Sequence, residues 1–168
     1  MKHTILLALA VGCAPSIEEG AFEGPGFDSE TGELTVGGDE LLVALTHLQV
    51  KNAPGPGGRF GDHAQGIGEW LYTEEPEGWV GAAFRNEGRL NWWTMTVWES
   101  EEAMLAFVTS DIHGAAMADL TDISVGAESR SDWMPREDLP LAWTDALDHL
   151  REAPGFQYGE STWFGEAP

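Results

Sequence analysis

The fold of this chain is decided by residues 92–111, which read WWTMTVWESEEAMLAFVTSD. In the first half every second residue is large and apolar with threonines between, the period of two that is typical of a β-strand. Ser100 follows as a helix N-cap, and the two glutamates after it suit the positive end of a helix dipole. Met104, Phe107 and Val108 then share one apolar helix face. The stretch predicts a strand that leads directly into an amphipathic helix.

Toward the N-terminus the pattern adds a hairpin partner, a helix and another strand. Residues 79–85 favour a strand, and the turn at 86–89 (Asn-Glu-Gly-Arg) joins it to the central strand. Asp62 is expected to cap a helix whose apolar face includes Ile67. The apolar run at 41–50 is expected to form the first strand.

Toward the C-terminus a helix restarts at Ser110, residues 123–131 alternate as a fourth strand, and an amphipathic helix begins at Leu141. The order is β-α-β-β-α-β with an extra C-terminal helix. This is a ferredoxin-like α+β fold, an antiparallel sheet with helices on one face. The aromatic residues at 155–164 show no clear period, so the sequence predicts no helix or strand for them.

The first twelve residues have the character of a secretory signal, with Lys2 followed by a short apolar run. That run is far shorter than the ~20 residues that span a bilayer as a helix. The sequence before Cys13 resembles the lipobox of bacterial lipoproteins, which implies cleavage before Cys13 and a diacylglycerol on its thiol. The alternative is a buried strand with an incidental cysteine. We expect a lipoprotein of the cell envelope, and Ala14 favours the outer membrane if the host is Gram-negative.

The segment that follows Cys13 is acidic and rich in glycine and proline. Residues 13–39 are therefore expected to be a flexible tether, and residues 40–168 one domain. The chain has 29 Asp and Glu against 8 Lys and Arg, a net charge of -21 at pH 7. Such a surface repels phosphates, which excludes nucleic acid as a partner. The sequence contains no recognised metal-binding motif.

Three stretches, 78–82, 92–111 and 113–117, resemble the dimeric α/β-barrel superfamily. This superfamily includes antibiotic-biosynthesis monooxygenases and haem-degrading monooxygenases. Its members often have a strand ending in VWES, an acidic first helical turn, an aromatic residue and a Ser-Asp break. The resemblance implies a homodimer in which two ferredoxin-like subunits pack their sheets into a barrel. Each subunit then keeps a pocket between its sheet and its helices.

His113 is the first candidate for that pocket, because the resemblance turns the face of Met117 toward it. A neutral imidazole there could act as a base or as a hydrogen-bond donor to a phenolic ligand. The alternative is a surface or capping histidine. Met117 and Phe107 align with the histidine ligand and the tryptophan of the haem-degrading members, so both depart from that pattern. Haem is therefore disfavoured, and no cofactor is expected.

Three further residues are candidates for the pocket. His47 could lie in the pocket or at a dimer interface. His63 could gate the pocket, or it could cap a helix or face solvent. Trp93 could be a wall of the pocket or a core residue. Met117 and Phe107 have the same alternative, since apolar residues at helical spacing are more often core.

These observations favour a lipid-anchored, monooxygenase-like protein that binds, and could oxidise, a small apolar aromatic molecule. Oxidation without a metal or an organic cofactor needs a substrate that forms a stabilised carbanion, and His113 is the candidate base. The alternative is a non-catalytic binding or interaction lipoprotein on the same fold. Haem binding or degradation is the third hypothesis.

Overall fold

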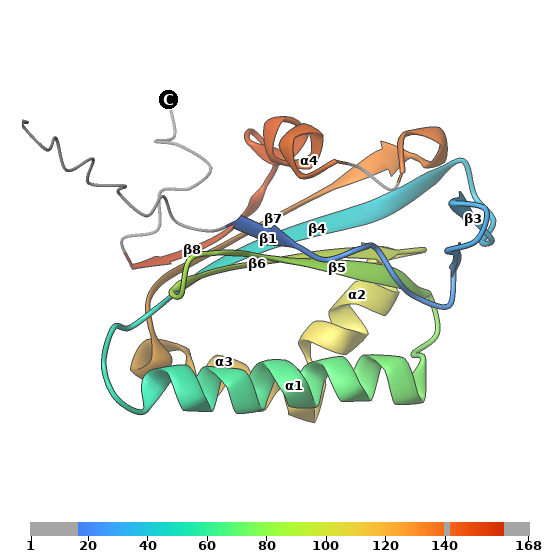
Figure 1. Ribbon diagram of the computed structural model, residues 1–168. Coiled ribbons are helices and arrows are strands. Elements are labelled where there is room, and N and C mark those ends of the chain that lie inside the picture. The colour runs from blue at the N-terminus through green and yellow to red at the C-terminus, as the bar shows by residue number, and fades with distance from the viewer. Residues whose placement is uncertain (1–16, 140–141, 160–168) are drawn as a thin grey trace, which may run out of the picture.

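The computed structural model describes residues 17–139 and 142–159 (Figure 1). Its centre is a six-stranded antiparallel sheet with the order β1-β5-β6-β4-β7-β8. The strands are β1 (Ile17–Glu19), β4 (Glu40–Val50), β5 (Trp79–Glu87), β6 (Asn91–Trp98), β7 (Ser124–Pro135) and β8 (Gly155–Gly159). A small separate sheet pairs β2 (Phe27–Asp28) with β3 (Glu33–Leu34).

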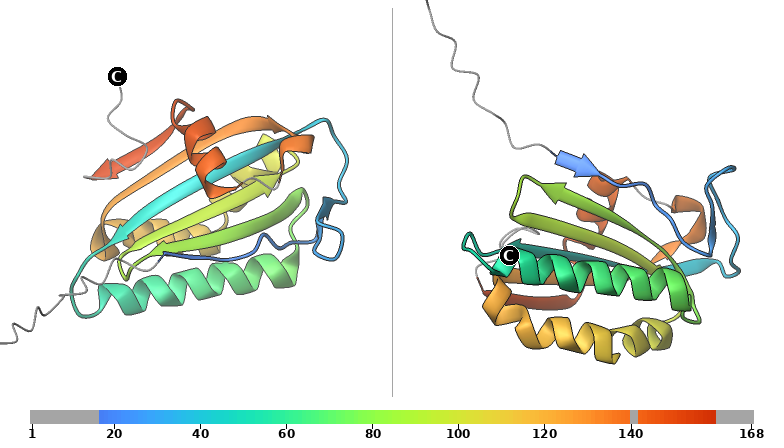
Figure 2. Two further views of the ribbon diagram at one scale, coloured as in Figure 1. Left: turned by 45° about the horizontal axis from the view of Figure 1, so that its top comes forward. Right: turned by 60° about the horizontal axis from the view of Figure 1, so that its bottom comes forward.

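Helices cover both faces of this sheet (Figure 1). On one face lie α1 (Pro56–Glu74), α2 (Glu101–Val108) and α3 (Asp111–Ile123), and Figure 2 shows α1 and α3 side by side. On the other face lies α4 (Trp143–Leu150), which follows the short 3-10 helix η1 (Arg136–Asp138). The elements from β4 to β7 form the expected ferredoxin-like β-α-β-β-α-β arrangement, and α4 is the expected C-terminal helix.

The two serine caps predicted from the sequence are confirmed. The Ser100 hydroxyl accepts a hydrogen bond from the Ala103 N–H at 3.1 Å, and the Ser110 hydroxyl accepts one from the His113 N–H at 3.4 Å. The first helix differs from the prediction, because it begins at Pro56 and not at Asp62. A proline in the first turn has its φ preset for a helix and lacks only an N–H that would be unpaired there.

The last strand, β8, was not predicted from the sequence. It pairs with β7 at the edge of the sheet, with Tyr158 opposite Ala127. The backbones approach so closely that a Cβ at Gly159 would lie 2.2 Å from the carbonyl oxygen of Val125. Glycine makes this pairing possible, but it also removes the side-chain alternation by which a strand is recognised.

The flexible tether expected at 13–39 is wrong for residues 17–36. β1 pairs with β5, and Phe22 and Leu34 are buried in the main core, together with Val80 of β5. This segment is acidic on average, but it contains a few apolar residues that pack against the sheet. The packed domain therefore begins well before residue 40, while residues 13–16 lie outside the described residues.

The main core lies between the sheet and α4. It contains alternate residues of β4 and β6 and one face of α4, namely Leu41, Val43, Leu45, Trp93, Met95, Val97, Trp143, Ala146 and Leu150. This sheet face was expected to need a second subunit as its cover, and that reason for a dimer is wrong, because α4 and the N-terminal segment cover it within the chain. A dimer would have to use another surface.

None of the helices within the described ranges has the length and apolarity needed to cross a membrane.

Candidate functional site

The sheet face beneath α1, α2 and α3 carries a second apolar cluster around Trp98 at one end and is less buried than the α4 side in its middle. On β4 the α4-facing residues Val43 and Leu45 are fully buried, whereas Thr46 and Leu48 on the helix side are only half-buried. Solvent therefore reaches the sheet under the three helices. This helix-side face is where the resemblance placed a pocket.

Hydroxyl groups occupy the middle of this face. Thr46 lies opposite Thr94 of β6 and Ser129 of β7, and residues paired across strands share a face. The neighbouring row adds two more hydroxyls. We call these five half-buried residues the hydroxyl patch: Thr46, Thr94, Thr96, Ser129 and Ser131. The Thr46 and Ser129 hydroxyl oxygens lie 3.0 Å apart, so one donates to the other.

Three stacked rings border the hydroxyl patch. Phe107 of α2 stacks on Trp98 of β6 at 5.3 Å between ring centroids, and on Trp70 of α1 at 6.0 Å. We call these residues the aromatic stack. The Trp98 Nε1–H donates to the Thr96 hydroxyl at 2.9 Å, which joins the stack to the hydroxyl patch. An apolar wall beside a few polar groups is the usual composition of a small-molecule site.

His113 lies against this stack, with its ring 4.8 Å from that of Phe107. Its Nδ1 is 3.0 Å from the carbonyl oxygen of Val108. A carbonyl can only accept, so Nδ1 carries the hydrogen and Nε2 keeps its lone pair. Burial lowers the pKa of His113, and the hydrogen bond to Val108 opposes this shift only in part. The lowered pKa favours the neutral form of this imidazole.

Met117 and His63 lie apart from the aromatic stack. Met117 is 43% exposed, on the same helix as His113. The His63 Nε2 atom lies 3.0 Å from a carboxylate oxygen of Asp119, so His63 links α1 to α3. That hydrogen bond is the main reason why the pKa of Asp119 is lowered. His63 thus belongs to a polar contact between helices, not to a gate in front of His113.

His47 and Trp93 lie on the opposite face of the sheet. Both are buried, and their ring centroids are 4.4 Å apart. Burial lowers the pKa of His47 to about 4, against a hydrogen bond with Asn91 that raises it. The prediction that these two residues share a pocket with His113 is wrong. Successive strand residues point to opposite faces, so the sheet itself separates Trp93 from Thr94.

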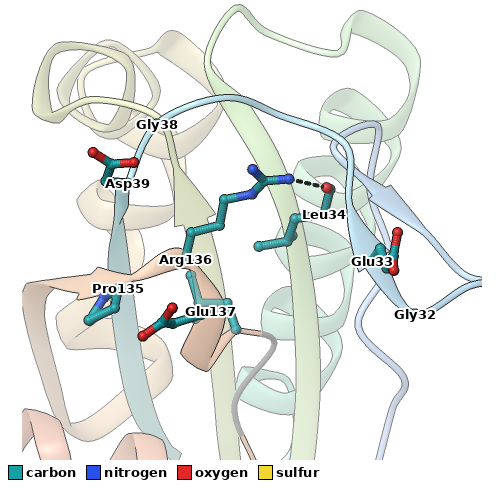
Figure 3. Close-up of a pocket in the computed structure, with 9 residues that line it drawn as sticks. Gly32, Glu33, Leu34, Gly38, Asp39, Pro135, Arg136 and Glu137 are labelled. Carbon is teal, nitrogen blue, oxygen red and sulfur yellow. Dashed lines mark hydrogen bonds between the residues drawn. The ribbon is translucent and has the colours of Figure 1, made fainter.

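His113 lines neither of two cavities that the described residues form. The first, of about 760 Å³, lies between the β3 end and η1 and has no aromatic side chain in its wall (Figure 3). Figure 3 shows Arg136 reaching across to the Leu34 carbonyl, to which it donates at 2.6 Å. The second, of about 250 Å³, lies at the β6 start and contains Phe60 and Trp92.

The hydroxyl patch and the second cavity were not predictable from the sequence. The alternating threonines of β6 were visible, but nothing local indicated that Thr46 and Ser129 would join them. Among residues 17–139 and 142–159, no three His, Cys, Asp or Glu side chains gather in a way that could hold a metal ion.

No protein-family profile and no curated protein sequence matches the chain, whereas several solved structures are similar to it. A candidate monooxygenase from Fusobacterium nucleatum superposes with a TM-score of 0.50 at 13% identity, covering 75% of this chain. This chain spans about half of that protein, 51% of its length.

Two other solved structures superpose with lower scores. A mutant of SnoaB, a cofactor-independent oxygenase from Streptomyces nogalater, gives a TM-score of 0.46 at 16% identity, covering 62% of this chain and 100% of that one. A candidate antibiotic-biosynthesis monooxygenase from Caulobacter crescentus gives 0.47 at 14% identity, covering 58% and 90%. The chain is thus similar in fold to the Fusobacterium nucleatum protein, and at 13% identity the likeness concerns the fold alone.

Proposed function

We propose that this chain is a monooxygenase-like protein that binds a small aromatic molecule on the helix-side face of the sheet and oxidises it without a cofactor. One observation carries the proposal. A histidine whose Nδ1 is hydrogen-bonded to the Val108 carbonyl, which leaves the Nε2 lone pair in the neutral form, lies against an aromatic stack that is joined to five half-buried hydroxyls. This combination suits a ligand with an apolar ring and an oxygen substituent.

Each part of the site has its own role in the proposal. The aromatic stack packs against the ring of the ligand, and stacked or edge contacts favour such packing. The hydroxyl patch donates to the ligand oxygen and stabilises the negative charge that develops there. The Nε2 atom of His113 removes a proton from the carbon beside that oxygen-bearing group, as a general base with a suitable pKa does.

The oxidation balances without an added reductant. After deprotonation the substrate carbanion gives one electron to O₂, and the two radicals combine to form a C–O bond. The imidazolium of His113 returns its proton to the peroxide, and the hydroperoxide then loses water to leave a carbonyl. A methylene group and O₂ thus become a carbonyl group and water, and the substrate supplies all four electrons.

Oxygen uptake with 2-tetralone tests this function. The methylene of this bicyclic ketone lies between its ring and its carbonyl, so it forms a stabilised carbanion. The full-length chain should consume one O₂ per dione formed, and His113→Asn should abolish this uptake. Binding of 2-tetralone without uptake would reject the enzyme and favour the non-catalytic binding protein. Absence of binding would reject the site itself.

We also propose that Cys13 carries a lipid that anchors the protein to the cell envelope. The support is the lipobox-like sequence alone, since Cys13 lies outside the described residues. A diacylglycerol with an N-terminal acyl chain provides the two or more chains that a stable anchor needs.

The homodimer implied by the resemblance is likewise a proposal. Large apolar side chains remain exposed on strands of the helix-side face, among them Phe84 of β5, Trp133 of β7 and Phe156 of β8. Such residues support association through a surface other than the one that α4 covers.

A further inference from the structure

The second cavity lies where three segments meet. These are the loop after β4, the first turns of α1 and the turn between β5 and β6. Inside it, the rings of Phe60 and Trp92 are in contact, with centroids 5.2 Å apart. Trp92 is two residues before Thr94 on β6, so both face the helices. The cavity therefore adjoins the hydroxyl patch.

Two cationic side chains line this cavity, Lys51 and Arg89. The Lys51 ammonium donates to the Thr121 carbonyl at 2.6 Å, and the Arg89 guanidinium donates to the Asn52 side-chain oxygen at 2.9 Å. Both partners are neutral, so each cation keeps its full charge. Within the part of the chain that the structure describes, neither residue forms an ion pair.

Two cations without carboxylate partners contrast with the composition of the chain, which has 29 Asp and Glu but only 8 Lys and Arg. Four of the other cations do pair with carboxylates, namely Arg59, Arg85, Arg130 and Arg151. The acids on the neighbouring α3 are also engaged, because Arg59 lies 3.8 Å from Asp119 and 3.7 Å from Asp122. Positive charge without a carboxylate partner thus combines with aromatic side chains at this cavity, whereas Arg136, which also donates to a carbonyl, lines a cavity without aromatic side chains.

The first turn of α1 adds to the same charge. Gly57 lines the cavity, and α1 begins with no side-chain cap and no acidic residue in its first turn. The N–H groups there carry the positive end of the helix dipole, which favours an anion. This contribution only supplements the two cationic side chains.

We propose that this cavity selects ligands that carry an anionic group, and that its ligand class is a small aromatic carboxylate. Lys51 and Arg89 bind the carboxylate, while the ring packs against Phe60 and Trp92 and extends toward the hydroxyl patch. A cavity of about 250 Å³ suits two fused rings. Binding at this cavity does not depend on the proposed oxidation at His113.

Calorimetric titration of the full-length chain with 2-naphthoate and 2-naphthol tests this selectivity. The two probes share a ring system and differ in charge. The naphthoate should bind about tenfold tighter or more, since a charge-assisted contact is worth roughly that factor. Added salt should reduce this advantage. Lys51→Gln and Arg89→Gln should each weaken naphthoate binding by about tenfold and leave naphthol binding unchanged.

Arg151→Gln is the matched control, because it removes the same charge from an exposed residue on the other side of the sheet. Equal affinity for the two probes, or equal losses in the Arg89 and Arg151 variants, would overturn the inference. Its failure is distinct from failure of the proposed function. If 2-tetralone is oxidised but naphthoate binds the Lys51 and Arg89 variants as tightly as the wild type, only the anion site is rejected. Selective naphthoate binding without oxidation rejects only the enzyme.

Discussion

The Nδ1 atom of His113 lies 3.0 Å from the carbonyl oxygen of Val108, so one imidazole ring joins the last residue of α2 to the first turn of α3. This contact holds the break between the two helices and sets the tautomer that leaves Nε2 basic. His113 therefore has a structural role through one nitrogen and a proposed chemical role through the other. A substitution can separate the two.

His113→Asn should retain the structural role and lose the chemical one. The asparagine amide can donate to Val108 as Nδ1 does, but nothing replaces Nε2. We expect the free energy of unfolding to stay within ~1 kcal/mol of the wild type while 2-tetralone oxidation is lost. His113→Ala should lose the oxidation and about 1 kcal/mol of stability, the contribution of one hydrogen bond. Denaturant titration and oxygen uptake measure these effects, and an active Asn variant would remove His113 as the base.

His47 should make the protein acid-sensitive. Its pKa is about 4 in the fold and near 6.5 when unfolded, so the unfolded chain binds the proton first as the pH falls. The stability that depends on neutral His47 is complete above pH 6.5 and decreases to pH 4, by about 3 kcal/mol. The carboxylate of Glu128, opposite His47, is engaged by Arg130 at 3.0 Å.

Chemical unfolding of the wild type and of His47→Phe at pH 7 and pH 4 measures this effect. The stability difference between the two proteins should shift in favour of the variant by that amount at pH 4. An unchanged difference for the His47 variant would contradict its burial in the neutral form.

Gly81→Ala should loosen the N-terminal segment. A Cβ at Gly81 would lie 2.7 Å from both the Glu23 carbonyl oxygen and the Phe22 ring, so the segment must move away from β5. We expect a loss of about 1–3 kcal/mol, as for other overpacked sites. Gly114→Ala in α3 meets nothing within 4 Å and should stabilise the protein slightly. Thermal unfolding of both variants tests the docking, and equal melting temperatures would argue for the flexible tether.

Cys13→Ser should release the protein from membranes. The hydroxyl cannot take the diacylglycerol, and no other anchor is expected from the sequence. Cell fractionation with an antibody to the domain compares the variant with the wild type. A variant that remains in the membrane fraction would reject the lipobox interpretation.

Association can be measured by light scattering of the full-length chain at micromolar concentration. The proposed homodimer should give about twice the 18.2 kDa of one chain. Trp133→Ser should shift the mass toward the monomer, because it removes an exposed ring from the helix-side face. A monomeric wild type would reject the proposed dimer.

The sequence by itself determined the elements that depend on local periodicity and on capping. The run from β6 into α2, the cap at Ser110 and the amphipathic α4 were all readable, because their signals lie within a few residues. The alternation of β6 also showed that Trp92 and Trp93 point to opposite faces. It did not show which face the three helices would cover.

Only the tertiary structure decided which residues that are distant in the sequence become neighbours. Strand pairing placed Thr46 beside Thr94 and Ser129, and it sent Trp93 into the core with α4. Loop closure brought Lys51 and Arg89 to one cavity. These contacts depend on the register and on the order of the strands in the sheet. A period of 2 or 3.6 residues fixes the face on which a side chain lies, but it does not fix which residue lies next to it.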